Sequence, residues 1–160
     1  MTTTTPALMP RTVTEAAGAR APIAEVEALI RDYTAAWNAR DPDLIAGFHA
    51  ADGIFQLHSG DSAPVRGREA VRDTFAGLLA QFPDLAFSEQ ELIAGPWGWV
   101  ARWRMSATLA STFEAGGRHA QPGSRFEIDA VDVITASRGR IDAKHTYLDW
   151  QARLEQLGLA

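Results

Sequence analysis

The feature that most constrains the fold is a change of hydrophobic period along the chain. Over residues 23–48 and 67–82, apolar residues recur every three or four positions, as on the buried face of a helix. Over residues 97–109, they alternate with mostly polar residues, which is typical of a strand with one buried face. A chain with helices first and neighbouring strands afterwards predicts an α+β fold, in which helices cover one face of a curved sheet.

Three helices are expected in the first half of the chain, with a short strand, residues 53–58, among them. The second helix begins with Asp41 as its N-cap and is expected to end at His49, because a cation favours a helix C-terminus. The third helix begins at Gly67 and ends near Phe82. The first helix begins at Pro22, and its apolar face carries Ile23, Val26, Ile30, Tyr33 and Trp37.

The second half is expected to form consecutive antiparallel strands over residues 85–93, 97–109, 125–134 and 140–149, followed by a short helix over 151–157. Ser137, Arg138 and Gly139 form the turn between the last two strands, and residues 116–123 form a glycine-rich loop. We therefore expect residues 22–160 to be a single domain. Residues 1–21, rich in Thr, Pro and Ala, are expected to be a disordered or loosely docked tail.

The composition excludes several kinds of function. The absence of cysteine excludes disulfides, thiolate catalysis and zinc–cysteine sites, and no two histidines have the helical spacing of a metal site. A net charge of −5 argues against a nucleic-acid partner. No apolar run approaches the ~20 residues that cross a bilayer, and no signal peptide is evident, so we expect a cytoplasmic protein without a membrane partner. Only one of the 15 basic residues is a lysine, Lys144, a bias that suggests a GC-rich genome and indicates nothing about mechanism.

Asp132 is the residue that most directly suggests chemistry. On the strand over residues 125–134, it lies in the middle of an otherwise apolar alternating row. An ionised carboxylate there is costly to bury unless it is protonated, has a partner, or meets water in a cavity. We favour a cavity, since buried carboxylates concentrate at functional sites. The alternative is a hydrated Asp132 on a row that faces solvent.

Tyr33 and the histidines leave more alternatives open. Tyr33 lies on the apolar face of the first helix, where a catalytic role and an ordinary core position are equally compatible with the pattern. Trp37, one turn later, is a packing residue or a pocket wall. His145 falls on the alternating row expected to point inward, whereas His58 ends its strand near a pocket mouth or solvent.

Four segments, taken in order, resemble a known family: residues 33–44, 49–55, 67–71 and 131–149. They are similar to the SnoaL-like and ketosteroid isomerase-like proteins of the nuclear transport factor 2-like superfamily. The similarity extends over about residues 23–149. It implies a cone-shaped curved antiparallel sheet, also described as a cystatin-like α+β barrel, that packs on the N-terminal helices around a deep apolar pocket.

The likeness to ketosteroid isomerases assigns roles to particular residues. In those enzymes, a first-helix tyrosine and a protonated aspartic acid on a late strand form the oxyanion hole. Tyr33 and Asp132 fall on these two positions. The position of the general base is Leu57, which cannot accept a proton. His58 could replace it only if the end of the strand turns that side chain inward.

The likeness to SnoaL-like polyketide cyclases fits the sequence better. In those proteins, the aspartate that matches Asp132 is the acid/base of an intramolecular aldol closure, often with a histidine as helper. His119 is the expected helper, because it precedes a segment, residues 122–125, that resembles a turn of the family.

We therefore expect cofactor-free acid/base chemistry, an aldol-type cyclisation or an enolisation, on a hydrophobic polycyclic or aromatic carbonyl compound. The alternative is a non-catalytic module of the same fold that binds a small molecule or dimerises. The family also implies a homodimer, to which Val131 and Val133 would contribute from the outer face of their strand. The expected pocket residues are Trp37, Phe55, Leu57, His58, Trp103 and His145.

Overall fold

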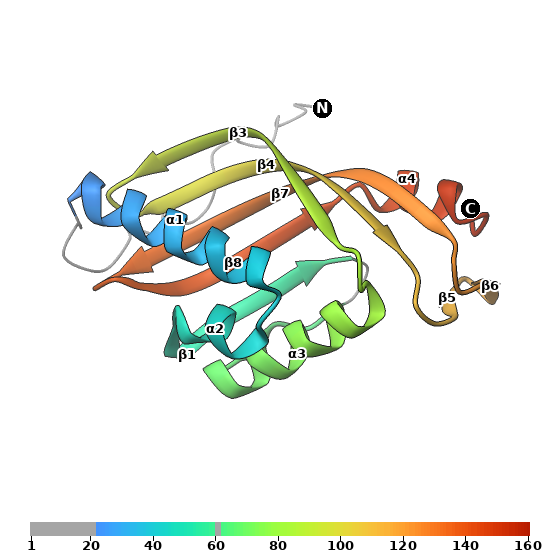
Figure 1. The fold of residues 1–160 in the computed structure, drawn as a ribbon, viewed down its shortest axis with the longest axis horizontal. Coiled ribbons are helices and arrows are strands. Elements are labelled where there is room, and N and C mark those ends of the chain that lie inside the picture. Colours follow the sequence, from blue (N-terminus) through green and yellow to red (C-terminus); the bar gives the residue numbers. More distant parts are fainter. Residues whose placement is uncertain (1–21, 60–61) are drawn as a thin grey trace, which may run out of the picture.

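The computed structural model describes residues 22–59 and 62–160, so the tail predicted for residues 1–21 lies outside the described residues. Three helices precede most of the strands, and a fourth closes the chain (Figure 1). Helix α1 covers the concave face of the bent sheet, and α2 and α3 lie beside strand β1. The helices are α1 (Ile23–Ala39), α2 (Pro42–Gly47), α3 (Arg68–Gln81) and α4 (Trp150–Gln156).

The six-stranded sheet has the order β2-β1-β8-β7-β4-β3, and β5 and β6 form a separate hairpin. The α+β class is confirmed, but the sheet is mixed, because β1 and β8 pair in parallel. The hairpin replaces the loop expected over residues 116–123. The strands are β1 (His49–His58), β2 (Val65–Arg66), β3 (Ala86–Gly95), β4 (Gly98–Thr108), β5 (Phe113–Ala115), β6 (Arg118–Ala120), β7 (Arg125–Ser137) and β8 (Arg140–Leu148).

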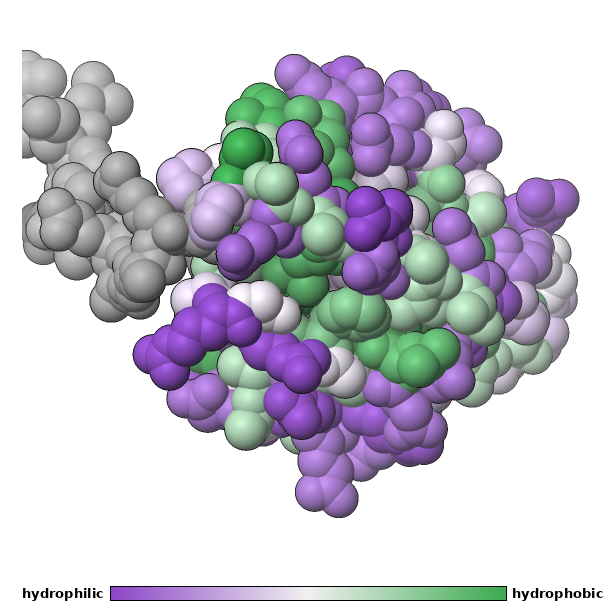
Figure 2. All heavy atoms as spheres, turned by 60° about the vertical axis from the view of Figure 1, so that its left-hand side comes forward, coloured by the Kyte–Doolittle hydropathy of each residue, from purple (hydrophilic) through white to green (hydrophobic). Residues whose placement is uncertain are grey.

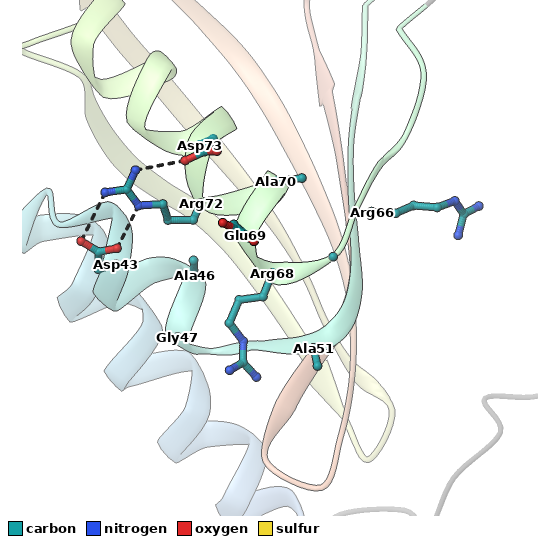
Figure 3. A pocket seen from close by; sticks show the side chains of 11 residues that line it. Asp43, Ala46, Gly47, Ala51, Arg66, Arg68, Glu69, Ala70, Arg72 and Asp73 are labelled. Atoms are coloured by element: carbon teal, nitrogen blue, oxygen red, sulfur yellow. Dashed lines mark hydrogen bonds and ion pairs between the residues drawn. The ribbon is translucent and has the colours of Figure 1, made fainter.

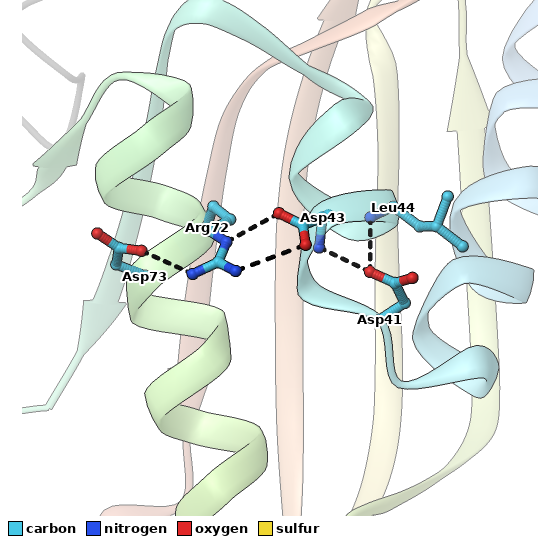
Figure 4. Close-up of polar contacts among 5 residues, drawn as sticks. All are labelled: Asp41, Asp43, Leu44, Arg72 and Asp73. Carbon is cyan, nitrogen blue, oxygen red and sulfur yellow. Dashed lines mark hydrogen bonds and ion pairs between the residues drawn. The ribbon is translucent and has the colours of Figure 1, made fainter.

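Local signals explain where the first two helices begin and end. Helix α1 ends at Arg40, which takes the left-handed conformation with a φ of 57°. Asp41 then caps α2, because its carboxylate accepts hydrogen bonds from the backbone N–H groups of Asp43 (2.9 Å) and Leu44 (3.1 Å) (Figure 4). The expected burial of Ile23 is wrong, since this side chain is 47% exposed.

Helices α2 and α3 are joined at the surface by ion pairs. The guanidinium of Arg72 on α3 contacts Asp43 on α2 at 2.9 Å and its neighbour Asp73 at 3.0 Å (Figure 4). The Arg72 guanidinium, through a hydrogen bond and its charge, lowers the pKa of the Asp43 carboxyl. All three side chains are exposed, so the link adds little to stability.

The long strands β4 and β7 turn one apolar row toward the helices, as their alternation predicts. On β4, Trp99, Ala101, Met105 and Ala107 are buried. On β7, the row that contains Asp132 is likewise buried on both sides of it. Antiparallel pairing sets Asp132 opposite Ala101 on β4 and opposite Thr146 on β8.

The alternation of β8 is interrupted by a bulge at Asp142. Thr135 of β7 pairs with Ala143, but the next residue, Ala136, pairs with Ile141, so Asp142 is left as an extra residue. Because side chains alternate between the two faces of a strand, one extra residue reverses which of them point inward. Ile141 is therefore buried before the bulge, and Lys144 is buried after it.

Figure 2 shows one face of the molecule, on which apolar residues gather near the centre and hydrophilic residues surround them. The large apolar residues that are exposed include Phe87, Ile93 and Tyr147. Across residues 22–59 and 62–160, no helix combines the length and the apolar character needed to cross a bilayer.

Candidate functional site

A cavity of about 650 Å³ lies between α1, α3 and the inner face of the sheet. Aromatic and aliphatic side chains form most of its wall, as in many small-molecule sites. Phe87 and Glu89 of β3 line it and are also exposed, so the cavity is open to solvent on that side. Of the expected pocket residues, Trp37, Phe55, Leu57 and Trp103 all line this cavity, together with Tyr33 and Asp132.

Asp132 is the centre of a polar cluster in this apolar wall. The Lys144 ammonium forms an ion pair with one oxygen of its carboxylate, and the Thr146 hydroxyl donates to the other at 2.6 Å. The side chains of Lys144 and Asp132 are only 7% and 13% exposed. Asp132 therefore has a partner inside a cavity, which combines two of the alternatives that the sequence left open.

Lys144, from which composition alone indicates nothing about mechanism, lies in the cavity wall. The reversal at the Asp142 bulge points Lys144, Thr146 and Leu148 inward. Strict alternation from Ile141 would have pointed them outward. The inward position of Lys144 can therefore be predicted only once the bulge is known.

Tyr33 lines the same cavity and is buried, and its hydroxyl lies 3.2 Å from Nε2 of His49. Burial raises the pKa of the Tyr33 phenol, so it stays protonated. Burial, together with the charges of Lys144 and Arg68, lowers the pKa of His49 to about 3, so its imidazole is neutral near pH 7. Nδ1 of His49 has no hydrogen-bond partner among the described residues.

His49 corrects a second expectation. It does not end a helix as an exposed cation, because α2 ends at Gly47 and His49 is the first residue of β1. Its backbone carbonyl accepts a hydrogen bond from Arg68 at 2.9 Å, and its ring is fully buried. The start of β1 thus holds the imidazole within hydrogen-bond distance of the Tyr33 hydroxyl.

The predicted inward position of His145 is wrong, and His58 does not turn inward to replace Leu57. After the Asp142 bulge, His145 points to the outer face, where its Nδ1 lies 3.0 Å from Nε2 of His58. His58 also stacks on Tyr147, with 4.1 Å between the ring centroids. Partial burial, and then the neighbouring His58, lower the pKa of His145. Neither histidine lines the cavity.

His119, the expected catalytic helper, does not reach the cavity either. It is exposed on β6, where it pairs with Glu114 of β5, and it is not among the residues that line the cavity. The hairpin formed by β5 and β6 holds it on the outside. The structure therefore brings Tyr33 and Asp132 together at one cavity and leaves His119 away from it.

Arg153 of α4 is a cavity residue that the sequence did not single out. It is only 4% exposed, lines the cavity, and lies over the rings of Phe82, Phe113, Phe126 and Trp150. Burial lowers the pKa of Arg153 to about 10, which leaves the guanidinium charged near pH 7. From the sequence, an arginine in a short closing helix is normally expected to be exposed to solvent. Only the tertiary structure therefore identifies Arg153 as a cavity residue.

A second hollow lies on the outside, between α2, β2 and the start of α3 (Figure 3). Its charged side chains are exposed and in part paired with one another, as between Asp43 and Arg72. It has no buried polar group that calls for a ligand, so the inner cavity is the candidate site. Within residues 22–59 and 62–160, no three His, Asp or Glu side chains are arranged to hold a metal ion.

The chain was compared with known families and structures. A model of the SnoaL-like domain matches residues 30–143. Comparison with curated protein sequences finds no match. A candidate SnoaL-like polyketide cyclase from Jannaschia sp. CCS1 superposes with a TM-score of 0.72 at 20% identity, covering 89% of this chain and 98% of that one.

Two further structures support the same fold. IdmH, a candidate polyketide cyclase from Streptomyces antibioticus, gives a TM-score of 0.66 at 25% identity, covering 83% of this chain and 98% of that one. A nuclear transport factor 2-like protein from Burkholderia thailandensis E264 gives 0.65 at 20% identity, covering 82% and 95%. The family match spans most of the chain and agrees with the resemblance found in the sequence. The chain therefore belongs to the SnoaL-like domain family and has the nuclear transport factor 2-like, or ketosteroid isomerase-like, fold.

Proposed function

We propose that the protein is a cofactor-free enzyme that enolises, or closes by an aldol step, a hydrophobic aromatic or polycyclic carbonyl compound in the inner cavity. The observation that carries the proposal is the Asp132–Lys144 pair. The other ion pairs among the described residues are exposed, whereas this one lies in an apolar cavity large enough for a small molecule. A base beside a cation is the arrangement that proton abstraction next to a carbonyl needs.

The chemistry follows from the positions of the two groups. The Asp132 carboxylate takes a proton from the carbon beside the substrate carbonyl, and the Lys144 ammonium donates a hydrogen bond to the oxygen that becomes the enolate. In an aldol closure, the enolate carbon bonds to a second carbonyl carbon of the same molecule. The alkoxide formed there receives the proton that Asp132 holds. Thr146 keeps the carboxylate in place through its 2.6 Å hydrogen bond.

Tyr33 supplies a second hydrogen-bond donor in this proposal. His49 is neutral, so its ring carries one proton, and Nε2 can either accept from the Tyr33 hydroxyl or donate to it. When Nε2 donates, the phenolic hydrogen is free to point into the cavity at a carbonyl oxygen. The apolar wall would hold the substrate in one folded conformation, and orientation alone can remove several kcal/mol of barrier.

The family supports a carbonyl substrate, because two of the structural neighbours are candidate polyketide cyclases. Two further features favour the alternative, a binding or dimerisation module. Leu57 stands at the position of the isomerase base, and both oxygens of the Asp132 carboxylate are already engaged by Lys144 and Thr146. A binding module of this kind would hold the same ligands and convert none of them.

The two alternatives are separated by hydrogen–deuterium exchange on 2-tetralone, a bicyclic ketone with acidic hydrogens beside its carbonyl. In D₂O at pH 7, the enzyme should accelerate the exchange seen by proton NMR well above buffer. Asp132→Asn should reduce the rate to the buffer level while 2-tetralone still binds, and the surface variant Arg72→Gln should match the wild type. Binding of 2-tetralone without any acceleration by the wild type would instead favour the binding module.

A further inference from the structure

Arg153 is buried, but it lacks the acceptors that two less buried arginines have. The Arg40 guanidinium donates to the backbone carbonyls of Phe82 and Leu85, each at 2.8 Å, and Arg68 donates to the carbonyl of His49 at 2.9 Å. Both are held by acceptors that the fold supplies. The guanidinium of Arg153 forms no hydrogen bond or ion pair with any residue in the described ranges, and its Nε is fully buried.

Aromatic rings alone compensate this buried charge. The Arg153 guanidinium carbon lies 4.4 Å from the centroid of the Phe113 ring and 4.8 Å from that of Phe126. Such contacts attract a cation through the ring faces, but they accept none of its five N–H donors. Leaving the buried Nε–H of Arg153 unpaired costs free energy, so a structural role alone does not account for this arrangement. An acceptor that enters the cavity would complete it.

The charges already in the cavity show what kind of acceptor is missing. The carboxylate of Asp132 is matched by Lys144, and Glu89 lies on the exposed side, where water solvates it. Arg153 is therefore the unmatched charge in the buried part of the cavity. Guanidinium groups bind carboxylates through two parallel hydrogen bonds, which is the strongest pairing available to them.

The two polar ends of the cavity are far apart. Lys144 and Leu148 both line it, and four residues of strand span about 13 Å. The Arg153 guanidinium lies at the far end, against Phe126 of β7, which is six residues along the strand from Asp132. A ligand that reaches both ends is thus on the order of 10 Å long or longer, the length of a few fused rings.

We propose that Arg153 binds a carboxylate at the end of the ligand remote from Lys144, so that the cavity selects hydrophobic carboxylic acids. This inference rests on the proposed function in taking the inner cavity as the ligand site. Beyond that function, it specifies a negatively charged ligand and the orientation of this ligand in the cavity, with the reacting carbonyl at Lys144 and the carboxylate at Arg153.

The test is a pair of probes of nearly equal shape, naphthalene-2-carboxylate and naphthalene-2-carboxamide, titrated into the full chain by calorimetry. The wild type should bind the carboxylate at least tenfold more tightly than the amide. Arg153→Met should remove that preference by weakening the carboxylate alone, with the amide affinity unchanged within twofold. Arg153→Lys should keep part of the preference, and thermal melting should show that both variants are folded.

A charge-neutral control locates the carboxylate within the cavity. The double variant Asp132→Asn with Lys144→Gln removes the ion pair without changing the net charge, so it should retain the preference for the carboxylate. The inference is overturned if the wild type shows no preference, if Arg153→Met keeps the preference, or if the double variant loses it. A carboxylate preference without 2-tetralone exchange would reject only the proposed function, and exchange without the preference would reject only this inference.

Discussion

The buried pair of Asp132 and Lys144 makes a sharp prediction about stability. Removing one partner leaves an unpaired charge in a largely apolar wall, which typically costs 3–5 kcal/mol. Because the cavity is open to solvent beside Phe87, we expect the low end, about 3 kcal/mol, for Asp132→Asn and for Lys144→Met separately. In a protein of this size, that loss lowers the melting temperature by roughly 6–12 °C.

The double variant Asp132→Asn with Lys144→Met should be far more stable than either single variant. It removes both charges together, leaves an amide that can still bond to Thr146, and should stay within about 1 kcal/mol of the wild type. Urea unfolding at pH 7, followed by tryptophan fluorescence, measures all four free energies of the cycle. The exposed pair of Asp43 and Arg72 is the matched control, and its neutral variants should leave the unfolding midpoint unchanged within error.

Additive losses would refute this reasoning. If the double variant were as unstable as the two single losses combined, Asp132 and Lys144 would act independently and the pair would not be buried as described. If both single variants were as stable as the wild type, the two charges would be solvated. A stable double variant that has lost exchange of 2-tetralone would instead separate the chemical role of the pair from any structural one.

Three further predictions follow from other parts of the molecule. Burial lowers the pKa of His49 from 6.5 to about 3, so unfolding takes up a proton between these pH values and stability falls as the pH falls through them. His49→Gln should therefore reduce the slope of the free energy of unfolding against pH by up to about 1.4 kcal/mol per pH unit. An unchanged slope in urea titrations from pH 6.5 to 4 would contradict this. Asp41→Ala removes two hydrogen bonds from the start of α2 and should cost about 1 kcal/mol in urea unfolding, whereas a neutral result would mean that the cap is not formed in solution. We also propose a homodimer through the outer sheet face that carries Val131 and Val133; Val131→Glu should shift it to monomers in sedimentation, and a wild type that is already monomeric at micromolar concentration would reject the dimer.

Most of the fold is predictable because its signals are local. The N-cap at Asp41, the turn at Arg138 and Gly139, and the alternation of β4 and β7 each depend on neighbouring residues alone. The same alternation places Asp132 inward without any knowledge of its partner. The parallel pairing of β1 with β8 depends on residues more than 80 positions apart, as between Phe55 and Lys144, so no local pattern indicates it.

The errors about the site come from features that sequence patterns do not register. One extra residue at Asp142 reverses the alternation of β8, which sends His145 outward and Lys144 inward. The helical pattern predicts His49 at a helix end, because helix and strand meet there within two residues and the boundary is ambiguous. The position of His119 depends on the short hairpin of β5 and β6, and tertiary packing places that hairpin on the outside of the molecule.

The cavity and its charges are best understood together. A chain selected for stability alone would fill a space of this size with larger side chains, because close packing of the core is favourable and cavities destabilise. It would also replace Asp132 and Lys144 by apolar residues, which is often neutral or stabilising, and it would give Arg153 an acceptor. The ion pair and Arg153 both line this one cavity. A single hydrophobic ligand with a carbonyl at one end and a carboxylate at the other would account for all of them, whereas three separate structural explanations would be needed without it.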